Sequence, residues 1–174
     1  MAPIKFNYLF LTSATLLLLF AAQCPSAEAR KFIGVNPWCH TASYRRLCTR
    51  MVAGATTWQD ASVNAMKSTL GLAKGLQGVV NLVKPAIASL SKTSQESIIA
   101  TCIDDFEGIV DDLEKSLQSM KIQDIGTIRS RLSAALSGDC EEALSEFHIQ
   151  SPISRYAKLL HKEVDNCLAV LLQI

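Results

Sequence analysis

The sequence has almost no net charge and no pattern typical of a β-sheet. Its 17 Lys and Arg residues nearly balance 16 Asp and Glu residues, which leaves a formal net charge of +1. So small a charge gives no general attraction to nucleic acid or to an anionic membrane, and we expect neither as a partner. No stretch alternates polar and apolar residues as a half-buried strand does, which argues against a sheet-based fold.

Catalytic motifs are also missing. The three histidines are His40, His148 and His161, and none stands at metal-ligand spacing from another. The chain has no G-x-S-x-G turn and no glycine-rich phosphate loop after a strand. Asp104 and Asp105 are adjacent carboxylates, but neighbouring helical positions point about 100° apart and do not share one acid–base site easily. We therefore expect no enzyme, no cofactor and no metal site.

The first residues look like a secretory leader. Lys5 precedes an almost continuously apolar stretch from Tyr8 to Ala22, and the small-x-small triplet Ala27-Glu28-Ala29 follows. We expect residues 1–29 to be a signal peptide that is removed on export. A signal anchor is the alternative, but the apolar run is short for a bilayer span and no second hydrophobic span follows it.

Cysteines are arranged as expected for a secreted, disulfide-stapled domain. Removing the leader takes Cys24 away and leaves five cysteines in about 145 residues, enough for one domain with a real core. Cys39 and Cys48 are too far apart for a redox Cys-x-x-Cys motif, so a structural disulfide is the expected state in an exported chain.

The later cysteines are placed symmetrically about a turn. Cys102 and Cys140 lie at nearly equal distances on either side of Lys121, so an antiparallel hairpin of two helices would bring them side by side. Cys167 remains without a partner. Its position between apolar residues predicts a buried inert thiol, rather than a nucleophile or a bridge between two chains.

Most of the remaining chain has the period of an amphipathic helix. Apolar residues recur at steps of three and four in the segments 58–91, 93–120, 125–136 and 153–171. Four such helices with short connections predict an all-α, up-down-up-down four-helix bundle. Residues 58–174 would form this bundle, and residues 30–57 a short disulfide-tied appendage in front of it.

Individual residues predict where these helices begin and end. Pro85 should kink or interrupt the first helix. Thr93, with Glu96 three residues later, predicts a capping box for the second. Asp124 should cap the third helix, and Gly138 should end it in a left-handed conformation. The pair Ser151-Pro152 predicts the start of the fourth.

Charges are distributed unevenly along the chain. Three arginines crowd the first cysteine loop, and six carboxylates crowd the second predicted helix: Arg45, Arg46 and Arg50, and Asp104, Asp105, Glu107, Asp111, Asp112 and Glu114. The simplest interpretation of both runs is two solvated faces.

The stretch from Cys39 to Cys48, CHTASYRRLC, resembles the opening of the plant pectin methylesterase and invertase inhibitors. Thr41, Tyr44 and Leu47 stand at matching positions, while Ser43 and Arg45 replace prolines that commonly flank the tyrosine. Further motifs follow in the family's order: TCIDDF with VDDL at 101–113, SAAL at 133–136 followed by CEE at 140–142, SPI at 151–153, and DNC at 165–167. The resemblance covers essentially the whole chain after the leader.

This resemblance implies a four-helix bundle with an N-terminal helical hairpin at residues 30–57, and disulfides Cys39–Cys48 and Cys102–Cys140. It also implies a secreted monomer of the apoplast and cell wall that blocks a pectin methylesterase or an acid invertase in a one-to-one complex over the active-site cleft. The family's acidic contact positions fall on four residues here: Asp104, Asp111, Asp124 and Glu142.

The sequence favours pectin methylesterase as the target without deciding between the two enzymes. Cys167 and the acidic second helix point to pectin methylesterase, and a Pro-Lys-Phe tripeptide of some invertase inhibitors is missing. Two positions depart from the family, since Asp139 replaces a usual threonine and Gly108 an acidic residue. A helical carrier of small apolar ligands is a third hypothesis, but large residues such as Phe106 and Leu160 are able to fill the cavity that it needs.

Overall fold

The computed structural model describes residues 34–173, all helix and connecting loop; the expected signal peptide lies outside this range. Two 3₁₀ helices and six α-helices follow in order: η1 (Pro37–Cys39), α2 (Arg45–Met51), α3 (Trp58–Val79), η2 (Val80–Ile87), α4 (Lys92–Lys121), α5 (Ile125–Ala134), α6 (Asp139–Glu146) and α7 (Ser154–Leu171). Within these residues, none of the helices is both long and apolar enough to cross a bilayer.

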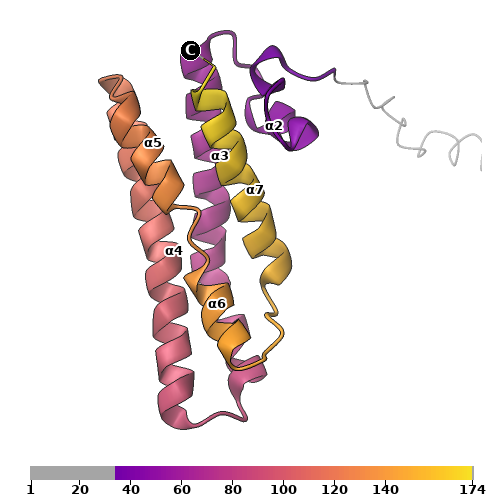
Figure 1. Ribbon diagram of the computed structural model, residues 1–174, viewed down its shortest axis with the longest axis vertical. Helices are drawn as coiled ribbons and strands as arrows, with labels where there is room; N and C mark the ends of the chain where they lie inside the picture. The colour runs from indigo at the N-terminus through magenta and orange to yellow at the C-terminus, as the bar shows by residue number, and fades with distance from the viewer. Residues whose placement is uncertain (1–33, 174) are drawn as a thin grey trace, which may run out of the picture. The chain divides into compact units, whose positions relative to one another are not determined.

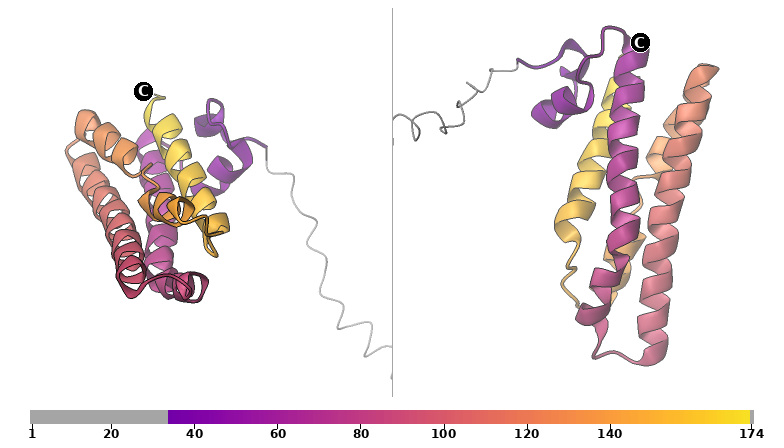
Figure 2. Two further views of the ribbon diagram at one scale, coloured as in Figure 1. Left: turned by 60° about the horizontal axis from the view of Figure 1, so that its bottom comes forward. Right: turned by 180° about the vertical axis from the view of Figure 1, so that it is seen from behind.

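The helices form an up-down-up-down bundle, which confirms the predicted fold class (Figure 1). α4 packs against α3 on one side and against α5 and α6 on the other, while α7 closes the bundle against α3 and α5. The third bundle helix is thus built from two pieces, with α5 beside one end of α4 and α6 beside its other half (Figure 2).

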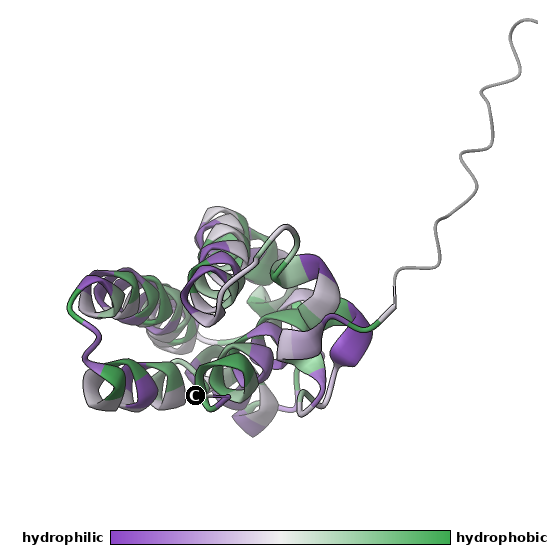
Figure 3. Cartoon of the chain, turned by 90° about the horizontal axis from the view of Figure 1, so that it is seen from above, coloured by the Kyte–Doolittle hydropathy of each residue, from purple (hydrophilic) through white to green (hydrophobic). Residues whose placement is uncertain are grey.

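The core consists of the apolar stripes of the four bundle helices. Viewed from above, apolar residues occupy the faces that the helices turn toward one another (Figure 3). Phe106, Leu113, Ile128 and Leu144 are among its largest side chains and are almost completely buried. These side chains pack into the core, but Phe106 and Leu160 do not fill all of the space beside them, since both line a hollow of about 250 Å³ between α4, the junction of α5 with α6, and α7.

The first bundle helix is interrupted, as Pro85 predicted. α3 gives way to the 3₁₀ helix η2 at Val80, because the proline ring clashes with the preceding turn and lacks an amide donor. The predicted capping box at Thr93 is wrong. Ser91 caps α4 instead, its backbone extended and its Oγ accepting a hydrogen bond from the N–H of Ser94 at 3.2 Å.

Two other predicted boundaries need correction. Gly138 does not end a helix in a left-handed conformation, because its φ is −147° and it is the N-cap of α6, a helix that the sequence did not reveal. α7 begins at Ser154 with Ile153 as its N-cap, later than Ser151-Pro152 predicted. Ser151 still contributes, because its Oγ accepts from the N–H of Ile153 at 3.3 Å.

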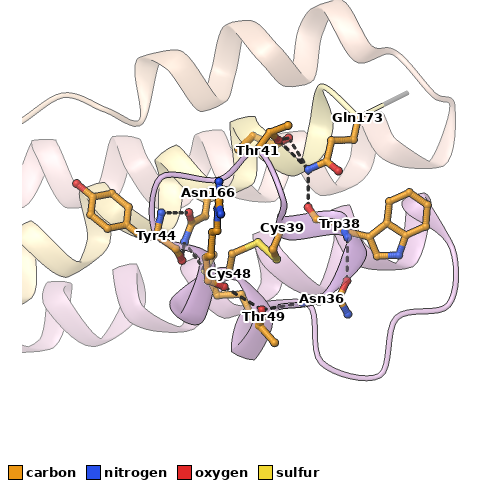
Figure 4. Close-up of a disulfide and its surroundings, with 12 residues drawn as sticks. Asn36, Trp38, Cys39, Thr41, Tyr44, Cys48, Thr49, Asn166 and Gln173 are labelled. Atoms are coloured by element: carbon orange, nitrogen blue, oxygen red, sulfur yellow. Dashed lines mark hydrogen bonds between the residues drawn. A yellow bond between two sulfur atoms is a disulfide. The ribbon is translucent and has the colours of Figure 1, made fainter. Parts of the chain in front are cut away.

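The N-terminal segment is attached firmly to the bundle. A disulfide joins Cys39 of η1 to Cys48 of α2 (Figure 4). Buried Asn166 of α7 accepts from the N–H of Tyr44 at 3.4 Å and donates to its carbonyl at 3.3 Å. Gln173 donates to the carbonyl of Trp38 at 2.6 Å. These bonds satisfy loop polar groups that would otherwise be buried without partners, so α2 packs as part of the compact unit that begins at Val35.

Candidate functional site: an acidic face on α4 and α6

Two of the predicted contact residues share one exposed face of α4. Asp104 and Asp111 are seven residues apart, close to two helical turns, so their side chains leave the helix in nearly the same direction about 10 Å apart. Both lie off the buried stripe. Asp111 pairs with Lys115 one turn further on. Asp104 forms no ion pair with any of the described residues, which leaves its carboxylate available.

Beside Asp104 lies a hollow between α4 and the junction of α5 with α6. Its volume is about 320 Å³, and four carboxylates contribute to its lining: Asp104, Asp105, Asp112 and Asp139. Gly108 contributes no side chain to it, and a Cβ added there would meet no atom within 4 Å. Ser137 adds a hydroxyl to the lining. The hollow is therefore open, polar and acidic.

Asp105 has a structural role that the sequence reasoning missed. Its side chain is buried, with 7% exposure, and its carboxylate accepts hydrogen bonds from Ser137 Oγ at 2.9 Å and from the N–H of Cys140 at 3.1 Å. Cys140 is in the first turn of α6, so Asp105 caps that helix from α4 in place of the absent side chain of Gly138. A signal was present, since Asp105 stands three residues after Cys102 and next to Phe106, on the inward side of the helix.

A second carboxylate ties α4 to α5. Arg131 donates to Asp112 Oδ1 at 2.9 Å, and both side chains are partly shielded from solvent. The charge-assisted bond holds one wall of the hollow in a fixed position. Asp112 and Asp105 therefore shape the acidic face from within, while Asp104 stands free at its edge.

Asp124 lies away from this hollow, at the end of the bundle. It is the N-cap of α5, as predicted, and its carboxylate accepts from the N–H of Thr127 at 3.0 Å. That bonding lowers the pKa of Asp124 below its ordinary value. From Asp104 to the end of α4 at Lys121 the rise is about 26 Å, so Asp124 does not join the same cluster.

Glu142 projects from α6 as an exposed side chain and does not line the hollow. The four predicted contact residues are thus spread along the molecule rather than gathered at one point. Only Asp104 lies at the hollow, and its acidic neighbours there are Asp105, Asp112 and Asp139.

One disulfide braces the region of the hollow, and the free thiol of Cys167 lies elsewhere, between α7 and α3. Cys102 of α4 is bonded to Cys140 of α6, both fully buried, which anchors α6 to α4 directly beneath the hollow. Cys167 is free and buried, with its sulfur 3.2 Å from Thr69 Oγ1. Burial raises the pKa of the Cys167 thiol to about 12, so it carries a proton at physiological pH and is a poor nucleophile.

The fold and the acidic face together place the chain in a structural class. Over residues 34–173 no group of three side chains is placed to hold a metal ion. What the bundle offers instead is a braced, solvent-facing acidic surface with one open hollow, supported by a disulfide and by a buried aspartate. Fold and site together define a disulfide-braced helical-bundle protein with an acidic hollow on its surface.

Comparison with known proteins gives the family. Residues 34–170 match the family described as plant invertase/pectin methylesterase inhibitor. The chain belongs to this family, since the match covers well over half of its length. Members of the family are inhibitors rather than enzymes and are extracellular. A search of curated proteins found no match.

A solved structure shows the same fold. A mutant form A of a pectin methylesterase inhibitor from Arabidopsis superposes with a TM-score of 0.64, at 15% identity, over 78% of this chain and 93% of that one. At this identity the likeness extends to the fold alone. Family and fold together support an inhibitor of pectin methylesterase or of invertase.

Proposed function

We propose that this chain is a secreted inhibitor of pectin methylesterase that binds the enzyme one-to-one over its active-site cleft and so modulates cell-wall pectin methylation. The observation that carries the proposal is the free carboxylate of Asp104 at the edge of the acidic hollow, on a helix that also presents Asp111. A cleft that handles galacturonic acid units must offer hydrogen-bond donors. Carboxylates on a rigid helical face can occupy those donors in place of substrate.

Rigidity is the physical requirement for such an inhibitor, because an already ordered surface loses little conformational entropy on binding. The Cys102–Cys140 disulfide, the Asp112–Arg131 pair and the Asp105 cap each fix one wall of the acidic face. The exposed carboxylates therefore stand on elements that need no rearrangement.

We further propose that residues 1–29 are cleaved as a signal peptide, that residues 30–57 and 58–174 form the hairpin and bundle of one inhibitor domain, and that this domain acts as a monomer in the apoplast. Asp124 and Glu142 would be peripheral contacts, since neither lines the hollow. The candidate second function is inhibition of an acid invertase, which family membership supports equally.

The deciding experiment titrates the purified mature protein against a plant pectin methylesterase and a cell-wall invertase in parallel. We expect stoichiometric loss of pectin methylesterase activity and no loss of invertase activity. The reverse pattern would assign the chain to invertase. If neither enzyme loses activity, both proposed functions are wrong.

Removing the exposed carboxylates should weaken inhibition without unfolding the bundle. Hydrogen bonds to charged groups contribute about 1.5–3 kcal/mol each, so we expect Asp104→Ala or Asp111→Ala to weaken binding by roughly tenfold or more. Asp111 already pairs with Lys115, so we expect the smaller loss there. Inhibition titrations measure the change, and circular dichroism checks the fold.

Glu96→Ala is the matched control, because Glu96 is an exposed carboxylate near the start of α4 and does not line the hollow. It should inhibit as the wild type does. Unchanged inhibition by the Asp104→Ala, Asp111→Ala double variant would exclude this face from the mechanism.

A further inference from the structure

A second surface, on the outer side of α7, is lined by positively charged side chains. Two hollows lie along the outer side of α7. One, of about 760 Å³, lies over the start of the helix, and the other, of about 510 Å³, lies between α7 and α2. They share Leu159 and Lys162 in their linings, so the two hollows are adjacent and are described together as one channel. The two helices lie side by side (Figure 1).

Six cations line this channel, which we call the basic channel: Arg155, Lys158 and Lys162 from α7, and Arg45, Arg46 and Arg50 from α2. The three on α7 stand at i, i+3 and i+7, the spacing that places side chains on one face of a helix. All six are exposed. None of them forms an ion pair with another described residue, and no carboxylate is among the residues that line either hollow.

Three acids among the described residues lie close to the channel but outside its lining. Glu141 accepts a hydrogen bond from Ser151 Oγ, a group that lines the first hollow, and Glu141 shares a neighbouring hollow with Lys158. Glu163 faces Arg50 from behind, but it is buried and accepts a hydrogen bond from Ser68 Oγ at 3.3 Å. Asp165 follows on α7 and lines neither hollow. Six cations kept close together, none of them in an ion pair with a described residue, cost free energy by mutual repulsion. An external polyanion would remove that cost.

Aromatic and polar groups flank the cations. Tyr44 and Tyr156 line one hollow each and remain 39% and 50% exposed, although most large apolar side chains of the bundle are buried. The Nζ of Lys162 lies 5.2 Å from the centre of the Tyr44 ring, which holds that ring in place. Figure 4 shows the Tyr44 ring at the outer edge of the N-terminal segment. Ser43, Gln150 and Ser154 supply hydroxyl and amide groups nearby.

We propose that the basic channel binds an anionic polysaccharide, a chain of sugar rings carrying carboxylates such as de-esterified pectin. Cations at repeated spacing match the carboxylates of a linear polymer, exposed tyrosine rings match the apolar faces of sugars, and the polar groups match their hydroxyls. The choice of polymer rests on the proposed function, because a pectin methylesterase releases carboxylates from methyl esters and so surrounds its inhibitor with this polyanion. Binding would retain the inhibitor where the enzyme's product accumulates.

The test measures binding of the purified protein to polygalacturonate by affinity electrophoresis or calorimetry, with no enzyme present. We expect binding at about 0.01 M ionic strength that weakens strongly at about 0.1 M, where the Debye length falls from about 30 Å to about 10 Å. Fully methyl-esterified pectin, which lacks the charge, should not bind. Polyglutamate has the carboxylates without the sugar rings, so it should bind less tightly, and equal binding would overturn the assignment to a polysaccharide.

Substitutions locate the site. The Lys158→Gln, Lys162→Gln double variant should bind polygalacturonate about threefold to tenfold more weakly, because each exposed charge pair contributes modestly. The control, Lys67→Gln with Lys84→Gln, changes net charge equally at exposed lysines outside the channel. Equal weakening by both pairs, or by neither, would overturn the proposal.

Inhibition assays on the same variants separate this proposal from the proposed function. Polymer binding without inhibition of either enzyme would contradict the proposed function and leave the basic channel standing. Inhibition without polymer binding would contradict the proposal for the basic channel and leave the proposed function standing.

Discussion

Asp104 and Asp105 are adjacent in sequence and have opposite environments. Asp104 is exposed and forms no ion pair among the described residues, whereas Asp105 is buried and accepts two hydrogen bonds from the start of α6 and the residue before Gly138. Adjacent residues on a helix point about 100° apart, so the carboxylate of Asp104 faces solvent while that of Asp105 supports the fold. Treating the acidic run as a single exposed surface therefore overlooks its structural member.

Replacing Asp105 by Ala should destabilise the protein far more than the same change at Asp104. The loss leaves the N–H of Cys140 and the hydroxyl of Ser137 without their charged acceptor, a cost of about 1.5–3 kcal/mol. Asp104→Ala, an exposed change, should stay within about 0.5 kcal/mol. Urea unfolding of both variants gives the comparison, and equal stabilities would show that Asp105 does not cap α6.

At the scale of a single element, α4 contains one weak position. Gly108 lies in the middle of this 30-residue helix, is exposed, and has open space around the position of a Cβ. Glycine in a helix interior costs about 0.5–1 kcal/mol relative to alanine, because it leaves the unfolded chain more freedom to lose. Gly108 therefore lowers the stability of α4, and it also leaves the acidic face without a side chain at this position.

Gly108→Ala should raise the free energy of unfolding by about 0.5–1 kcal/mol, measured by denaturant titration. Gly108→Asp has room for its side chain and adds an acid beside Asp104, but it lies one turn from both Asp104 and Asp112, so it should be less stable than Gly108→Ala. We expect tighter inhibition from Gly108→Asp than from Gly108→Ala. Equal inhibition by the two would show that the hollow does not meet the enzyme's donors.

The boundaries of these elements show what local sequence could and could not reveal. Apolar periodicity predicted α3, α4, α5 and α7 but not α6, and Pro85 predicted the interruption after α3, because both signals act within a few residues. The division of the third bundle helix could not be predicted in the same way. It depends on Asp105, which is 35 residues before the amide that it caps. Gly138 alone fits either a helix end or a helix start.

At the scale of the whole molecule, one ionisable group lies where three elements meet. Glu163 of α7 is 7% exposed, bonds to Ser68 of α3, and faces Arg50 of α2. Burial raises the pKa of Glu163 above its ordinary value, even though these neighbours favour the charged form. The sequence placed this residue on a helix but gave no sign that it is buried.

This carboxyl should make the protein more stable in mildly acidic solution. A raised folded-state pKa means that the folded protein binds the proton more tightly. The resulting stabilisation is fully present below the unfolded pKa of about 4.5 and is lost as pH rises through the folded pKa. We expect Glu163→Gln, which cannot ionise, to flatten the decline of melting temperature as the pH rises above about 4.5.

The control is Glu107→Gln, at an exposed position on α4, which should leave the pH profile of the wild type unchanged. Asp124 acts in the opposite sense. Because its pKa is lowered in the folded protein, it contributes stability above about pH 3.8, and this stability is lost in stronger acid. A profile for Glu163→Gln as steep as that of the wild type would show that another group sets the decline.

The short helix α6 has a consequence for how the molecule opens. Eight residues are too few to remain helical alone in water, so α6 is held by the Cys102–Cys140 crosslink and the Asp105 cap. The hydrogen-exchange rate of the α6 amide protons therefore measures how well the crosslink and the cap hold this helix. When the crosslink is reduced, they should exchange with solvent deuterium well before those of α3 or α7, which makes α6 the first cooperative unit to open and the acidic hollow the first surface to lose its shape.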